Sequence, residues 1–208
     1  MQKSTNKHTM NNDDIKAHYA AIEAAFPNEE LQAIHDKAVE MVKSNINQQD
    51  VQYEKVSQVL FVYPYEKEKP PYIFALLDAF YDDETREKSR TMVTEQLIKE
   101  DIHIKAATLV SEVWIGTAQK DDPDSIKKAM EEKNSHKVEG AMIATMSLDL
   151  RAVTNIHTIH RTPSGHITIG ERSQEYPLHR LSKDEILHSY LAKLFIEYIT
   201  TKAKKGKL

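Results

Sequence analysis

The sequence predicts an α+β fold, in which an antiparallel sheet of five to six strands packs against helices. Three observations lead to this prediction. Residues 102–117 form the longest run of β-forming side chains and contain the only tryptophan. Further strand-like runs follow along the chain, and the last two form a hairpin pattern. Segments with apolar residues three and four positions apart lie before and after these strands, as in amphipathic helices.

The chain of 208 residues is long enough for one domain with its own core and a helical arm. The first residues are polar and without periodicity, which is typical of disordered tails. The expected organisation is a disordered tail (1–11), a helical hairpin (12–47), an α+β domain (48–201) and a basic tail (202–208).

Composition excludes several classes of protein. The absence of cysteine excludes disulfides and thiolate chemistry. The five glycines, at positions 116, 140, 165, 170 and 206, form neither G-x-G-x-x-G nor G-x-x-x-x-G-K, the glycine motifs that bind phosphate groups. We therefore expect no cofactor. The net charge of -4 does not indicate a nucleic-acid binder. Because no apolar run reaches membrane-spanning length and the N-terminus lacks a secretory apolar region, we expect a cytoplasmic protein that does not enter a membrane.

The first two helices are predicted on either side of Pro27. Residues 12–26 place apolar side chains on one face, and a second amphipathic helix runs from about Asn28 to Ile46, so together they form an αα-hairpin. Such a hairpin packs on its own domain or serves as an arm that binds a partner.

Two strands and a third helix follow. Residues 56–63 and 72–80 read as an antiparallel pair joined by a proline-bounded loop. Asp82 or Asp83 can cap a helix that runs to about Glu100. One stripe of this helix is expected to face the sheet: Thr85, Ser89, Met92, Val93, Gln96 and Leu97.

The run at 102–117 carries apolar residues on both faces, which is typical of a central strand covered on each side. We place Trp114 in the core because it lies near the end of this run. The unusual length predicts a bend or bulge near Ser111 and Glu112. The charged segment 118–137 that follows could contain a short helix.

The strongest hairpin pattern lies near the C-terminal end. After a strand at 138–150, residues 153–161 and 166–171 flank a Pro-Ser-Gly turn whose Gly165 suits a left-handed conformation. This register pairs Ile159 with Ile169 and turns His160 and His166 to the opposite face.

The last helix is expected to begin with a capping box of Ser182 and Glu185. Its main apolar face runs from Leu187 to Tyr198, while Ile196 and Ile199 lie beside that face. Because these two isoleucines leave apolar surface outside the main face, we expect a homodimer with both of them at or near the contact. The terminal lysines are expected to be solvated at the negative end of the helix.

Three groups of polar residues are candidate sites. Glu112 lies inside an apolar strand and could be a catalytic acid, although an edge-facing or salt-bridged glutamate is the favoured interpretation. His160 and His166 could bind a metal, although hairpin histidines that are in solvent or hydrogen-bonded are favoured. A third group consists of four carboxylates, Asp78, Asp82, Asp83 and Glu84. They could serve a metal-dependent enzyme, but helix capping explains them better.

Short motifs carry a resemblance to a known family. They are Ser111, Glu112 and Trp114 in an S-E-x-W strand, then an Asp-Pro loop at 121–124, then an apolar strand at 138–146. This pattern resembles a family of uncharacterised bacterial and phage proteins, over roughly residues 55–150. The resemblance implies an intracellular α+β domain and supplies no activity. In the family pattern a basic residue follows the proline. Here Asp124 follows it, and the basic residues Lys127 and Lys128 come later.

The function expected from the sequence is that of a non-catalytic interaction or accessory protein of a bacterium or phage. Its partner would be another protein or a second copy of itself, and a role in binding nucleic acid is not expected. The alternative is a metal-dependent hydrolase or nuclease that uses Glu112 with the face of His160 and His166.

Overall fold

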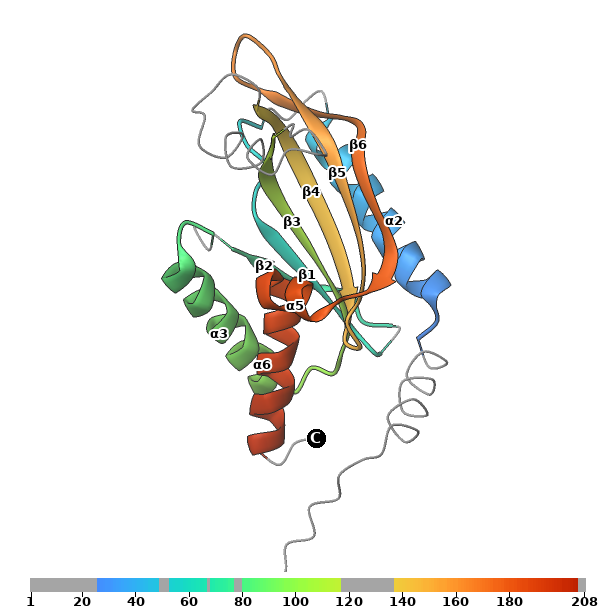
Figure 1. Cartoon of the computed structure of the whole chain (residues 1–208), viewed down its shortest axis with the longest axis vertical. Coiled ribbons are helices and arrows are strands. Elements are labelled where there is room, and N and C mark those ends of the chain that lie inside the picture. Colours follow the sequence, from blue (N-terminus) through green and yellow to red (C-terminus); the bar gives the residue numbers. More distant parts are fainter. Residues whose placement is uncertain (1–25, 49–52, 67, 77–79, 117–136, 206–208) are drawn as a thin grey trace, which may run out of the picture.

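The computed structural model describes residues 26–48, 53–66, 68–76, 80–116 and 137–205 (Figure 1). Six strands form one sheet in the order β2-β1-β3-β4-β5-β6, and every neighbouring pair is antiparallel. The predicted α+β class and antiparallel sheet are therefore confirmed. The strands are β1 (Val59–Pro64), β2 (Tyr72–Ala75), β3 (Ile104–Gly116), β4 (Lys137–Ser147), β5 (Arg151–Arg161) and β6 (Ile167–Arg180).

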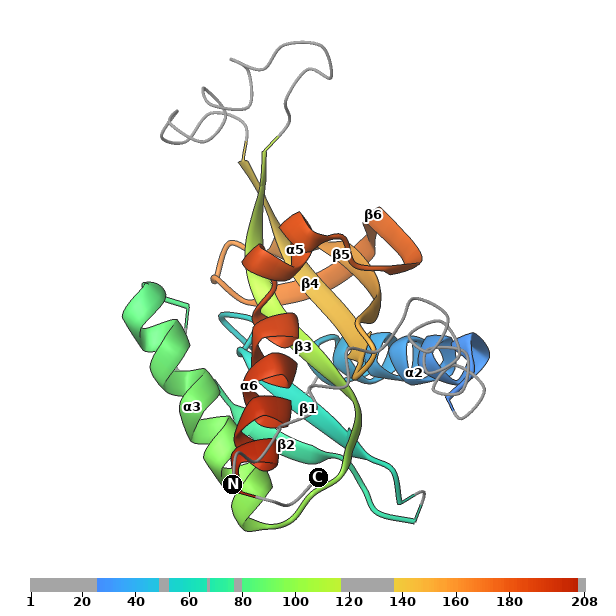
Figure 2. The same cartoon turned by 60° about the horizontal axis from the view of Figure 1, so that its bottom comes forward.

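Helices cover both faces of the sheet. On one face lies α2 (Asn28–Ile46); on the other lie α3 (Asp83–Lys99), α6 (Tyr190–Lys204) and the short α5 (Lys183–His188) (Figures 1 and 2). The predicted second helix of the N-terminal hairpin is α2. The predicted helix before it, apart from Phe26, lies outside the described residues, as does most of the charged segment 118–137.

The central position of β3 is confirmed, since it pairs with β1 on one side and β4 on the other. Leu109 belongs to the core under α3 and α6, and the next residue, Val110, belongs to the core under α2. A bulge near Ser111 and Glu112, one form of the expected irregularity, is wrong, because the pairing with β4 runs without a shift from Ala106 to Gly116. Continuous pairing with β4 keeps this part of the strand in register in spite of its length.

Trp114 corrects a second expectation, because its side chain is 61% exposed rather than buried. It lies near the end of β3, opposite Glu139 of β4, where this hairpin projects beyond the helices (Figure 2). Apolar periodicity shows which side chains share a face of a strand, but not how far along the strand the covering helix reaches.

The hairpin of β5 and β6 follows its predicted register, with Ile159 opposite Ile169. Gly165 has a φ of +88°, the left-handed conformation that the turn requires. The second strand runs further than expected, to Arg180, and contains Pro177. A proline is tolerated there because β6 is the edge strand of the sheet.

The C-terminal helix is divided in two, which was not predicted. The capping box of Ser182 and Glu185 begins α5 as expected, but Ser189 adopts an extended conformation and caps a new helix, α6, through the backbone N–H of Ala192. Leu187, expected on the apolar face, consequently lies in α5 and is 62% exposed. The solvated position expected for the lysines does not apply to Lys202, which is buried in α6.

The remaining differences from the predicted pattern are small. Asp82 caps α3 as predicted, but Met92 of the expected buried stripe is exposed, whereas Thr94 and Ile98 are buried. These two residues are buried because α6 packs beside α3, so the covered face of α3 is broader than a single stripe facing the sheet.

Candidate functional site

The helices on the α6 side leave part of the sheet uncovered. Along β5 the side chains alternate: Val153 and Asn155 on the α2 face are buried, whereas Thr154 and Ile156 on the α6 face are only half-buried. On the neighbouring β4, Met142 repeats this pattern. A regular alternation of this kind in central strands shows that one face is closed and the other is open.

The open part of the sheet forms the floor of a groove of about 680 Å³, which we call the β4–β6 groove. Residues of α5 and of the start of α6, which lie over the sheet in Figure 2, line the groove. Phe80, which precedes α3, and Arg86 in the first turns of α3 also line it. Its size is within the range of small-molecule sites, about 300 to 1,000 Å³. The apolar lining comes mainly from Leu109, Met142, Ala144, Ala152, Ile156, Leu181 and Leu191.

One polar pair borders the groove. His179 Nε2 lies 2.9 Å from Glu185 Oε1, and Nδ1 of the same ring lies 2.9 Å from the carbonyl oxygen of Pro177. Because both ring nitrogens face acceptors, the doubly protonated ring fits this site best. The Pro177 carbonyl and Glu185 accordingly raise the pKa of His179. Hydrogen bonds from Ser182, together with His179, lower the pKa of Glu185 to about 2, so Glu185 is ionised at neutral pH.

The groove lining also holds an aromatic pair and a guanidinium. The rings of Phe80 and Tyr190 lie 5.0 Å apart between centroids, and the Tyr190 hydroxyl is 3.0 Å from Ser89 Oγ. Burial raises the pKa of Tyr190, which therefore stays neutral. The guanidinium of Arg86 lies 5.8 Å from the Phe80 ring centroid, and its Nη1 donates to Asp83 at 2.8 Å.

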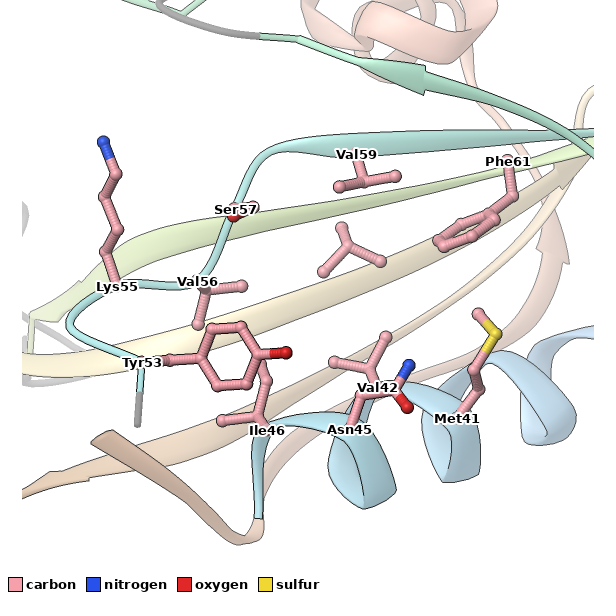
Figure 3. A pocket seen from close by; sticks show the side chains of 11 residues that line it. Met41, Val42, Asn45, Ile46, Tyr53, Lys55, Val56, Ser57, Val59 and Phe61 are labelled. Carbon is pink, nitrogen blue, oxygen red and sulfur yellow. The ribbon is translucent and has the colours of Figure 1, made fainter. Parts of the chain in front are cut away.

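A smaller hollow lies on the other face of the sheet, between α2 and β1 (Figure 3). Its volume is about 180 Å³. Met41 and Ile46 of α2 face Val59 and Phe61 of β1 across it, and the amino group of Lys55 extends away from it (Figure 3). This hollow has no charged group directed into it in Figure 3 and offers less room, so the β4–β6 groove is the better candidate site.

Buried polar residues under α2 form a structural network rather than an open site. His35 Nδ1 lies 3.0 Å from Thr145 Oγ1, which lies 2.8 Å from Thr108 Oγ1. His157 is also buried, and neither of its ring nitrogens has a hydrogen-bond partner among the described residues. Burial lowers the pKa of both histidines, which keeps them neutral. All of these side chains are closed to solvent, so a substrate has no access to them.

The candidate residues predicted from the sequence lie apart from the groove. Glu112 accepts hydrogen bonds at 3.3 Å from Arg161 Nη2 and from the Val56 backbone N–H, so it is the salt-bridged residue favoured above. His160 contacts Thr158 Oγ1 at 3.4 Å, whereas His166 contacts Ser164 Oγ at 3.0 Å in the turn. The structure therefore places these three residues in separate local contacts.

The predicted carboxylate cluster is also divided among structural contacts. Asp82 caps α3, Asp83 pairs with Arg86, and Glu84 pairs with Lys88 at 2.6 Å. Asp78 lies outside the described residues. Across the part of the chain that the structure describes, no three metal-ligating side chains converge on one point.

The groove was not predicted, and only part of it left a signal in the sequence. Thr154, Ile156 and Thr158 share one parity of β5, and a mixture of apolar and hydroxyl side chains is common on half-open faces. His179 and Glu185 are six positions apart on different elements, so their contact had no sequence signature.

Comparisons with known proteins add no family or fold assignment: no family model, curated protein or solved structure matches this chain. Among the described helices, none is long and apolar enough to cross a membrane.

Proposed function

We propose that this chain is a non-catalytic binding protein and that the β4–β6 groove is its binding site. The observation that carries this proposal is the half-buried apolar floor formed by Met142 and Ile156 in the middle of the sheet. Apolar side chains on central strands are ordinarily covered by the protein's own helices. Here a concave apolar surface of ligand size stays accessible, which is typical of a site that takes an apolar group from outside.

The contacts of the polar residues support a role without catalysis. His179 and Glu185, the titratable pair at the groove, are bonded to each other and to structural partners, Pro177 and Ser182. A general base needs a free lone pair directed at its substrate. Both ring nitrogens of His179 are engaged by Pro177 and Glu185, and Glu185 is held by the helix cap, so the pair fixes α5 against β6 instead.

The proposal can be tested with Nile red, an uncharged fluorophore whose emission increases in apolar sites. We expect saturable binding of one dye per chain, lost in Ile156→Glu because that change places a charge in the floor. Ile73→Glu is the matched control, since Ile73 is 65% exposed on β2 at the other edge of the sheet. Absence of dye binding, or equal loss in both variants, would overturn the proposal.

We further propose that the chain forms a homodimer through the outer surface of α6. Ile196 and Ile199 are 46% and 36% exposed on this helix, which leaves apolar surface available for a second copy. Light scattering at micromolar concentration tests this: a mass near twice 23.9 kDa that falls on Ile196→Glu supports the dimer, and a mass near 23.9 kDa contradicts it. A bacterial or phage origin and a cytoplasmic setting, both expected from the sequence, belong to this proposal.

A further inference from the structure

The β4–β6 groove combines an apolar floor with a guanidinium in its lining. The floor residues come from β4 and β5, and Leu181 and Leu191 add to the apolar lining. Transfer of hydrocarbon from water into such a groove is favourable by about 0.8 kcal/mol for each buried CH₂ group. An occupant with a large apolar part therefore fits the lining of the groove better than a polar molecule.

Arg86 has unused hydrogen-bonding capacity at the groove. Its side chain lines the groove and is 37% exposed, so part of the guanidinium can be reached from solvent, although Nε itself is buried. A carboxylate can accept from two guanidinium nitrogens at once. Its present partner, Asp83, has a side chain that is 98% exposed, and exposed ion pairs contribute little. Arg86 is thus available to a negatively charged group that enters the groove.

The other charged groups of the groove do not oppose an anion. Glu185 is the acidic residue in the lining, and its carboxylate already contacts His179 Nε2 at 2.9 Å. His188, which also lines the groove, carries no negative charge. A cationic occupant would meet Arg86 without a free carboxylate to receive it. One available guanidinium, rather than a cluster, matches a single negative charge.

We propose that the β4–β6 groove binds a free long-chain carboxylic acid, with its hydrocarbon on the floor of β4 and β5 and its carboxylate on Arg86. This inference rests on the proposed binding function and adds the class of the ligand. The carboxylate accepts from the exposed part of the Arg86 guanidinium, and the hydrocarbon chain covers the half-buried side chains of Met142 and Ile156. Binding is non-covalent, and no bond is formed or broken.

The test compares three competitors of equal chain length against bound Nile red: dodecanoic acid, dodecanol and dodecylamine. We expect the acid to displace the dye with an affinity at least about tenfold higher than that of the alcohol or the amine, because a hydrogen bond to a charged group contributes about 1.5 to 3 kcal/mol. Arg86→Gln should lower the affinity for the acid to that for the alcohol. Arg86→Lys should retain part of the difference in affinity between the acid and the alcohol.

Arg90→Gln is the matched control. Arg90 lies one turn further along α3, pairs with Glu197 at 3.7 Å and does not line the groove. Its loss should leave acid binding unchanged. If Arg86→Gln does not fold, as judged by circular dichroism, the comparison of the three competitors on the unmodified chain still decides.

The possible results separate the two proposals. Dye binding with equal displacement by acid and alcohol, or with no displacement by the acid, overturns the ligand class but leaves the groove as a binding site. Equal effects of Arg86→Gln and Arg90→Gln also overturn the ligand class. Absence of dye binding overturns the proposed function itself.

Discussion

The two faces of the sheet are closed in different ways. Under α2 the contact includes directional polar bonds, among them His35 with Thr145, and Arg151 donates to the Phe26 carbonyl and to Asn28, each at 2.6 Å. Under α3 and α6 the core is mainly apolar, and among the described residues it includes Ala152 of β5 and no residue of β6.

This difference separates a fixed face from an adaptable one. Hydrogen bonds between buried groups require one arrangement, because a displaced partner leaves an unsatisfied donor or acceptor. Apolar contacts have no such direction, so the edge of an apolar core can receive foreign hydrocarbon without leaving polar groups unpaired. The face that is held by packing is therefore the one on which a binding groove can be kept open.

The largest effect is expected for Phe195→Ala in α6. Phe195 is fully buried between α6 and the sheet, so its removal leaves a cavity and should lower the free energy of unfolding by about 3 to 5 kcal/mol. Urea denaturation followed by circular dichroism measures this change. A loss below about 1 kcal/mol would mean that α6 is not fastened by its apolar face.

A pair of substitutions compares the two faces directly. Ile143 lies on β4 under α2 and is fully buried, whereas Ile156 on the neighbouring β5 faces the groove and is half-buried. We expect Ile143→Ala to cost about 2 to 5 kcal/mol and Ile156→Ala about 1 kcal/mol or less. Equal costs in the same denaturation experiment would show that the groove is closed in solution.

The buried histidines on the α2 face of the sheet should make the stability of the protein depend on pH. Burial lowers the pKa of His157 below its ordinary value, with Lys43 and Arg172 acting in the same direction. The unfolded chain therefore binds the proton more readily, and stability is lost as pH falls from about 6.5 through the lower pKa of the folded state. His157→Phe removes the contribution of His157 to this loss of stability. The buried His35, whose pKa is also lowered, continues to reduce stability as pH falls.

The measurement is the thermal midpoint at pH 7 and at pH 5.5. The midpoint of the unmodified chain should be lower at pH 5.5, and the difference should be smaller in His157→Phe. An unchanged pH dependence in the variant would show that His157 is not buried as a neutral ring. His166→Phe is the control, because His166 lies in the exposed turn.

The smallest effect is expected for Trp114→Ala. Because this side chain is 61% exposed beyond the reach of the helices, its removal should change the free energy of unfolding by about 0.5 kcal/mol or less. A decrease of several kcal/mol in the free energy of unfolding would mean that Trp114 is buried, as the sequence alone predicts. Tryptophan fluorescence gives a second measurement, since an exposed indole is readily quenched by iodide.

Much of the fold could be predicted from local patterns. Apolar residues on both parities identified β3 as a central strand, and the Pro-Ser-Gly turn specified the pairing of Ile159 with Ile169. The caps at Asp82 and Ser182 were also readable, because a cap depends on residues within one turn of the chain. These features involve neighbours in sequence, where spacing and residue type determine the geometry.

The tertiary structure decided what covers each face. Periodicity placed Trp114 and Leu187 on apolar faces, yet both are exposed because β3 extends past the helices and Ser189 divides the last helix. The β4–β6 groove exists because α3 and α6 cover only part of their own face of the sheet and leave side chains of β4 and β5 half-buried. Burial depends on the position and length of distant elements, and side-chain spacing within a single strand carries no information about them.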